Sequence, residues 1–119
     1  MKNFSINHRQ EGEYDILELN GELDAHTASR LENALTDLIQ SERNQIIVNF
    51  EDLEYIASAG LGVFMAYIED VRNMGGDIKL SSMNSKVFNV FDLLGFPTLY
   101  DIVDDEHDAM ERFKQDEQK

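Results

Sequence analysis

Ser58 is the residue of this chain whose neighbours most clearly allow chemistry. Ala57 and Ala59 flank it directly, and Gly60 and Gly62 follow, so the hydroxyl is sterically open. An apolar run precedes the serine and an amphipathic run follows it, which predicts the start of a helix. Helix N–H groups and the helix dipole favour a serine oxygen or an added anion there. The pattern indicates either a hydroxyl that a partner can modify or a plain helix cap.

The chain lacks the signatures of several enzyme and metal sites. The alanines around Ser58 do not fit the G-x-S-x-G nucleophile elbow, and no Walker A lysine follows the glycines. The acidic residues at 101–108 lack the ligand order of a calcium loop. The histidines have no zinc-ligand spacing; they are His8, His26 and His107. We therefore expect no metal and no cofactor, and a small serine hydrolase is disfavoured.

The charge of the chain narrows its partners. Its 119 residues contain 24 acidic side chains and 10 Lys or Arg, which gives a net charge of −14. Such a surface repels nucleic-acid phosphates and anionic membranes, so neither is expected as a partner. The carboxylates of Glu51, Asp52 and Glu54, shortly before Ser58, would instead speed association with a basic protein surface.

Length and hydropathy set the class of protein. A chain of this length suits one domain. It contains no cysteine, and its apolar runs are far shorter than a membrane span. The first residues do not combine a basic segment with an apolar one, as an export signal would. We expect a cytoplasmic protein.

Strands and helices are predicted to alternate along the chain. Strands are expected at residues 4–8, 14–19, 45–50, 77–81 and 98–102. The first two form a hairpin, and the apolar third strand is typical of a sheet interior. Glu51, Asp52 and Glu54 are expected to form an acidic turn after it.

Helices are expected at residues 27–40, 59–74, 85–94 and 106–113. The alternation predicts an α/β sandwich with a partly parallel sheet. Residues 1–113 should form the domain, and the polar residues 114–119 are expected to fray.

The second predicted helix is unusually apolar. Val63 and Tyr67 fall on a flank of its core-facing stripe, so they either widen that stripe or form the rim of a docking surface. Four methionines are most simply interpreted as core filler; they are Met65, Met74, Met83 and Met110.

Several segments together resemble the STAS domain family. They are GELD at 21–24, IIVNF at 46–50, DLEYI at 52–56, SAGLG at 58–62 and the glycine pair at 75–76. Their order and spacing are similar to those of stand-alone anti-sigma factor antagonists of bacterial partner-switching systems, over essentially the whole chain. The resemblance implies a single α/β domain with a small mixed sheet, helices packed mainly on one face and an N-terminal edge strand.

The resemblance also implies a function. Members are not enzymes. Each binds a kinase of the histidine-kinase-like ATPase type, which phosphorylates one serine and so releases the antagonist, and a metal-dependent phosphatase reverses the mark. Aligning the family pattern Asp-Ser-Ser/Thr-Gly-Leu-Gly on residues 60–62 makes Ser58 the acceptor. The chain departs from the pattern at Ala57, where aspartate is usual, and at Ala59, where a second hydroxyl is usual.

The same alignment implies a set of partner-binding residues around Ser58. They are Asp24, Tyr55, Ala57, Ala59, Gly60, Leu61, Gly62 and Val63. Asp24 either contacts the partner or only starts the helix that follows it. Two functions remain open: a protein-binding module switched by phosphorylation of Ser58, and a scaffold or ligand-binding STAS domain in which Ser58 is only a helix cap.

Overall fold

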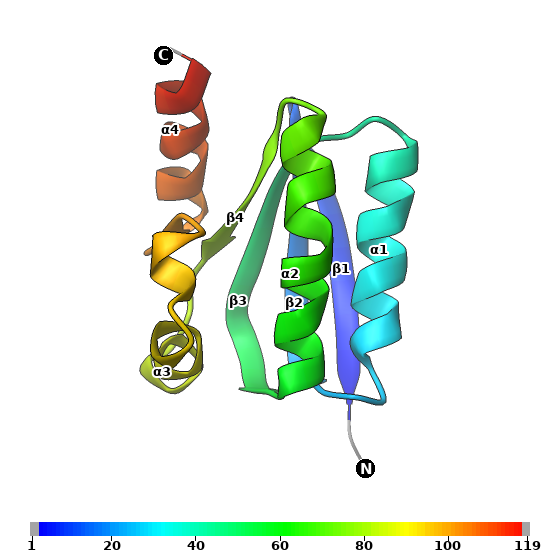
Figure 1. Ribbon diagram of the computed structural model, residues 1–119, viewed down its shortest axis with the longest axis vertical. Helices are drawn as coiled ribbons and strands as arrows, with labels where there is room; N and C mark the ends of the chain where they lie inside the picture. Colours follow the sequence, from blue (N-terminus) through cyan, green and yellow to red (C-terminus); the bar gives the residue numbers. More distant parts are fainter. Residues whose placement is uncertain (1–2, 118–119) are drawn as a thin grey trace.

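A five-stranded mixed sheet in the order β1-β2-β3-β4-β5 forms the centre of the protein (Figure 1). The computed structural model describes residues 3–117. β1 and β2 are antiparallel and the other neighbouring strands are parallel, which confirms the predicted fold class and the N-terminal edge strand. The strands are β1 (Phe4–Glu11), β2 (Tyr14–Leu23), β3 (Gln45–Ile56), β4 (Asp77–Ser81) and β5 (Ile102–Val103).

Helices cover both faces of this sheet unequally. α1, α2 and α3 share one face, and α4 lies on the other (Figure 1). This arrangement confirms that the helices pack mainly on one face. No helix within residues 3–117 is long and apolar enough to cross a bilayer. The helices are α1 (Ala28–Gln40), α2 (Ser58–Asn73), α3 (Ser85–Leu93), the short 3-10 helix η1 (Phe96–Thr98) and α4 (Glu106–Glu117).

The alternation of side chains along the strands produces two apolar clusters. In β2, Leu17 and Leu19 pack into the larger cluster beneath α1, α2 and α3, whereas Ile16 packs into the smaller one beneath α4. Successive strand residues point to opposite faces. A strand covered on both sides must therefore be apolar throughout, as the run at the start of β3 is.

A buried lysine ties α4 to the sheet. The Lys79 ammonium donates hydrogen bonds to Asp101 at 2.6 Å, to Asp116 at 2.8 Å and to Asp77 at 3.0 Å. It also lies 4.7 Å from the centre of the Phe113 ring. Burial alone would lower the pKa of Lys79, but the three carboxylates together raise it above its ordinary value. The ammonium thus supplies the positive charge that this acidic cluster requires.

The structure differs from several predicted boundaries. β1 and β2 run three and four residues past their expected ends, to Glu11 and Leu23. β3 continues to Ile56, so Glu51, Asp52 and Glu54 lie in a strand and the expected acidic turn is wrong. The final edge strand expected at residues 98–102 is present only as β5, which begins at Ile102, because η1 ends at Thr98 and residues 99–101 are not in a strand. α4 runs four residues past the expected end, to Glu117, so residues 114–117 are helical where fraying was expected. Residues 118–119 lie outside the described part of the chain.

The first turn of α2 and the last turn of α4 lie at opposite ends of the molecule (Figure 1). β3 delivers the chain to the same end of the sheet at which β1 begins, and α2 starts there. This end carries Ser58.

Candidate functional site

Ser58 is the first residue of α2 and is exposed. The N-cap position belongs to Ala57, whose backbone is extended and whose side chain makes no capping bond. The interpretation of Ser58 as the helix cap is therefore wrong. The Ser58 hydroxyl makes no hydrogen bond to any residue within 3–117. A partner can reach this oxygen without breaking a contact of the fold.

Backbone hydrogen bonds hold the chain on both sides of Ser58. The Ala57 N–H donates to the Leu23 carbonyl at 2.9 Å, which fixes the end of β3 against the end of β2. The Ala57 carbonyl accepts from the N–H groups of Gly60 at 3.0 Å and Leu61 at 3.2 Å. Ser58 therefore sits on a rigid turn rather than on a mobile loop, and its position relative to the sheet is well defined.

The two glycines after Ser58 have different surroundings. Gly60 is buried, and a Cβ added there would lie 2.7 Å from Leu23 Cγ and 3.1 Å from Ile56 Cγ1. A Cβ added at Gly62 would meet no atom within 4 Å. Gly60 thus allows α2 to pack closely on the ends of β2 and β3, whereas Gly62 leaves the outer surface of α2 flat.

The predicted partner-binding residues fall into two groups. Tyr55, Ala59 and Gly62 are exposed together with Ser58, and Ala57 is half-buried. The exposed fraction of Tyr55 is 45%. The other four residues lie beneath the surface; they are Asp24, Gly60, Leu61 and Val63. For Val63 the core interpretation is confirmed and the docking-rim interpretation is wrong.

Asp24 forms the turn before α1. Its side chain is only 4% exposed. One carboxylate oxygen accepts a hydrogen bond from the His26 N–H at 2.9 Å, and the Thr27 hydroxyl accepts one from the Asp24 N–H, also at 2.9 Å. Its carbonyl accepts the Ala28 N–H at 2.8 Å. These bonds give Asp24 the role of starting α1, and its burial leaves little surface for a partner to touch.

An uncharged stripe extends from Ser58 along the outer face of α2. Its members are the exposed residues Ser58, Ala59, Gly62, Met65 and Ala66. Met65 is 48% exposed, so its interpretation as core filler is wrong. The spacing from Ser58 to Met65 is seven residues, about two helical turns, and this signal identifies the shared face. In a chain of net charge −14, two helical turns of exposed, uncharged surface are typical of a docking face.

Exposed carboxylates lie along the strand that leads to Ser58. Glu51, Asp52 and Glu54 are exposed along the second half of β3. Glu22, Glu54 and Tyr55 line one shallow depression together with Lys86. This end of the molecule therefore combines an open hydroxyl, an uncharged stripe on α2 and an acidic rim along β3.

Comparison with known proteins identifies a family match over most of the chain. The family model described as the STAS domain matches residues 5–109. The anti-sigma-B factor antagonist of Bacillus subtilis (strain 168) is 30% identical over 94 residues, which cover 78% of this chain and 85% of that protein.

Two solved structures share the fold. An anti-sigma factor antagonist from Mycobacterium paratuberculosis has a TM-score of 0.86 at 17% identity, covering 94% of this chain and 95% of that one. The Bacillus cell fate determinant SpoIIAA in its phosphorylated form has a TM-score of 0.70 at 23% identity, covering 92% of this chain and 98% of that one.

Proposed function

Because the chain belongs to the STAS domain family, we propose that it is a cytoplasmic anti-sigma factor antagonist. In this proposal it binds an anti-sigma factor that is a serine kinase of the histidine-kinase-like ATPase type. The kinase transfers a phosphoryl group to Ser58, and the modified protein leaves. A phosphatase restores the hydroxyl. The protein acts as a binding module and catalyses no reaction of its own.

The observation that carries the proposal is the exposed Ser58 hydroxyl at the start of α2, at one end of the uncharged stripe. The names of the curated relatives and the phosphorylated form of SpoIIAA support the same function. The stripe supplies apolar surface that docking buries, with Met65 as its largest side chain. The acidic rim along β3 favours a basic kinase surface and speeds encounter.

Phosphorylation at this position changes the interface more than the fold. The γ-phosphoryl group of ATP bonds to Ser58 Oγ as ADP leaves, and the hydroxyl proton passes to a base of the kinase. The phosphate carries about −1.5 to −2 charges near neutral pH. Free N–H groups in the first turn of α2 can hold it in the unbound protein. In the complex the same charge would be buried against an uncharged surface, so the complex weakens.

The test is phosphorylation by an anti-sigma factor kinase from the same organism, followed by mass spectrometry. We expect one phosphate on the unmodified protein and none on Ser58→Ala. Ser85 provides a matched control, because it is also the exposed first residue of a helix, α3. Ser85→Ala should accept phosphate as the parent does. A phosphate that maps to Ser85, or no phosphate on the parent protein, would contradict the proposal and favour a scaffold without a switch.

A further inference from the structure

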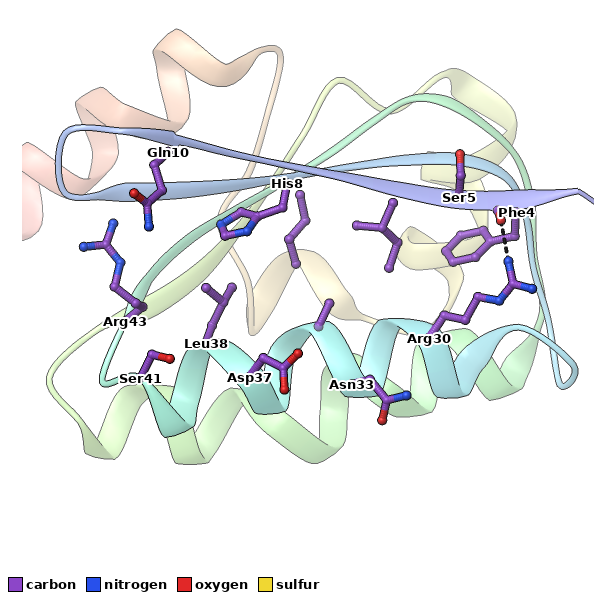
Figure 2. A pocket seen from close by; sticks show the side chains of 13 residues that line it. Phe4, Ser5, His8, Gln10, Arg30, Asn33, Asp37, Leu38, Ser41 and Arg43 are labelled. Carbon is purple, nitrogen blue, oxygen red and sulfur yellow. Dashed lines mark hydrogen bonds between the residues drawn. The ribbon is translucent and has the colours of Figure 1, made fainter.

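A groove of about 640 Å³ lies between the edge strand β1 and helix α1 (Figure 2). Its lining includes no residue of α2, so it is separate from the surface around Ser58. Small-molecule sites in proteins have volumes of about 300 to 1,000 Å³. The groove therefore has the size of a ligand site, and its chemistry can be read from its walls.

The middle of the groove is apolar. Ile6 of β1 and Leu17 of β2 form the sheet side, and Ala34 and Leu38 form the α1 side. The small side chain of Ala34 leaves room between α1 and the strand. From Phe4 to His8 the strand advances by about 13 Å, at about 3.3 Å per residue. This length suits an extended hydrocarbon chain lying parallel to β1.

One end of the groove holds a fixed cation. Asp15 is fully buried there, and Arg43 Nε donates to its Oδ2 at 2.6 Å. His8 Nε2 lies 2.8 Å from the other oxygen, Oδ1. The terminal nitrogens of Arg43 have no acceptor among residues 3–117, and one of them, Nη2, is enclosed. A guanidinium held in this way is ready to donate to a planar anion, because its orientation is already set.

Other groups at the groove favour the Arg43 end for an anion. Gln10 and Ser41 lie at the same end as Arg43 and offer neutral donors (Figure 2). Asp37 lines the groove from the last turn of α1, between Asn33 and Ser41, and repels an anion from the centre of the groove. Arg30 lies at the opposite end and already donates to the Phe4 carbonyl at 2.7 Å.

We propose that the groove between β1 and α1 binds a small amphipathic carboxylate. The carboxylate accepts hydrogen bonds from Arg43, and the hydrocarbon tail lies over Ile6, Leu17 and Ala34 towards Phe4. Apolar burial provides affinity, and the guanidinium selects an anionic head group over a cationic one. This site is independent of the proposed phosphorylation of Ser58, so either can fail without the other.

The test is a titration of the full chain, labelled with nitrogen-15, with decanoate, followed by NMR of the backbone amides. We expect saturable shifts centred on β1 and α1, with a dissociation constant below about 1 mM. Acetate, which lacks the tail, and decyltrimethylammonium, which has the opposite charge, should each bind at least tenfold more weakly. No saturable shift with decanoate, equal binding of the cationic probe, or shifts centred on the exposed Leu93 and Leu94 of the α3 end would overturn the proposal.

Two variants separate the tail and head-group contacts. Ala34→Phe fills the middle of the groove and should weaken decanoate binding at least tenfold, with folding checked by circular dichroism. Arg43→Lys keeps the charge, removes the planar donors and should also weaken binding. Arg30→Lys is the matched control at the other end and should bind as the parent does. If Arg30→Lys weakens binding and Arg43→Lys does not, the head-group assignment is wrong.

Discussion

Adding one methyl group at Gly60 and at Gly62 is expected to have opposite effects on stability. Both glycines lie in the first turns of α2, and neither adopts a positive φ angle. Only their surroundings differ. Gly60→Ala would place its Cβ 2.7 Å and 2.8 Å from two atoms of Leu23, a side chain with no exposed surface. Gly62→Ala would place its Cβ in open space.

The expected free energies follow from two effects. Replacing glycine by alanine in a helix stabilises the fold by about 0.5–1 kcal/mol. Overpacking a core by one carbon costs about 1–3 kcal/mol. Gly62→Ala gains only the stabilisation from helix propensity. At Gly60 the cost of overpacking outweighs the gain in helix propensity, so the free energy of unfolding should fall by about 1 kcal/mol. The Tm should move by about 4 °C per kcal/mol in each direction.

Substitutions on α2 should affect the affinity for the kinase differently from the way they affect stability. Gly62→Gln adds a long uncharged side chain to the docking stripe and should weaken association at least tenfold, about 1.4 kcal/mol, without loss of stability. Asn73→Gln, at the exposed far end of α2, is the matched control and should bind normally. Thermal melts and titration calorimetry measure both properties. A Gly62→Gln variant that binds as tightly as the parent, or a Gly60→Ala variant that is more stable, would refute this account of α2.

Three further outcomes are expected. Ser58→Asp should weaken kinase binding, but by less than phosphorylation does, because it adds only about one negative charge. Ser58→Ala should bind as tightly as the unmodified protein. Calorimetry that finds equal affinity for the phosphorylated and unmodified forms would contradict the switch. Lys79→Met should lower the free energy of unfolding by about 3 kcal/mol, because it leaves three carboxylates without their buried cation. Urea unfolding measures this loss. An unchanged free energy of unfolding would show that the cluster is solvated. Burial raises the pKa of Asp101, but the hydrogen bond and charge of Lys79, together with the charges of Arg112 and Arg72, outweigh burial and hold that pKa below the ordinary value. The stability that Asp101 contributes is therefore present above about pH 4 and lost as the pH falls further. Acid unfolding of Lys79→Met should lack part of this dependence.

The sequence predicted the fold and the position of Ser58 because both depend on local patterns. Alternating elements and small residues before a helix are visible without tertiary contacts. The second half of β3 was misassigned because its carboxylates at Glu51, Asp52 and Glu54 are typical of a turn. In the strand they point to solvent, while Leu53 and Ile56 between and after them pack inward. The buried residues here recur every three positions rather than every two, because the pairing with β2 shifts register twice, so the usual strand alternation is broken.

Other features depend on packing that no local pattern contains. The sequence could not distinguish Gly60 from Gly62, because the difference is the position of Leu23 on another strand. The groove beside β1 depends on the space between α1 and the edge of the sheet, and its cation comes from Arg43, which follows the end of α1. Met65 was assigned to the core because methionine usually fills gaps there.

The opposite positions of Ser58 and the last turn of α4 determine how this domain can be attached to other molecules. The molecule is 43 Å along its longest axis, and the two features lie at its two ends (Figure 1). A fluorophore, an affinity tag or a surface linker joined after α4 would stand clear of the kinase-docking end. The same group joined before β1 would emerge beside Ser58 and compete with the kinase for space. Immobilised binding assays on this protein should therefore be tethered through α4.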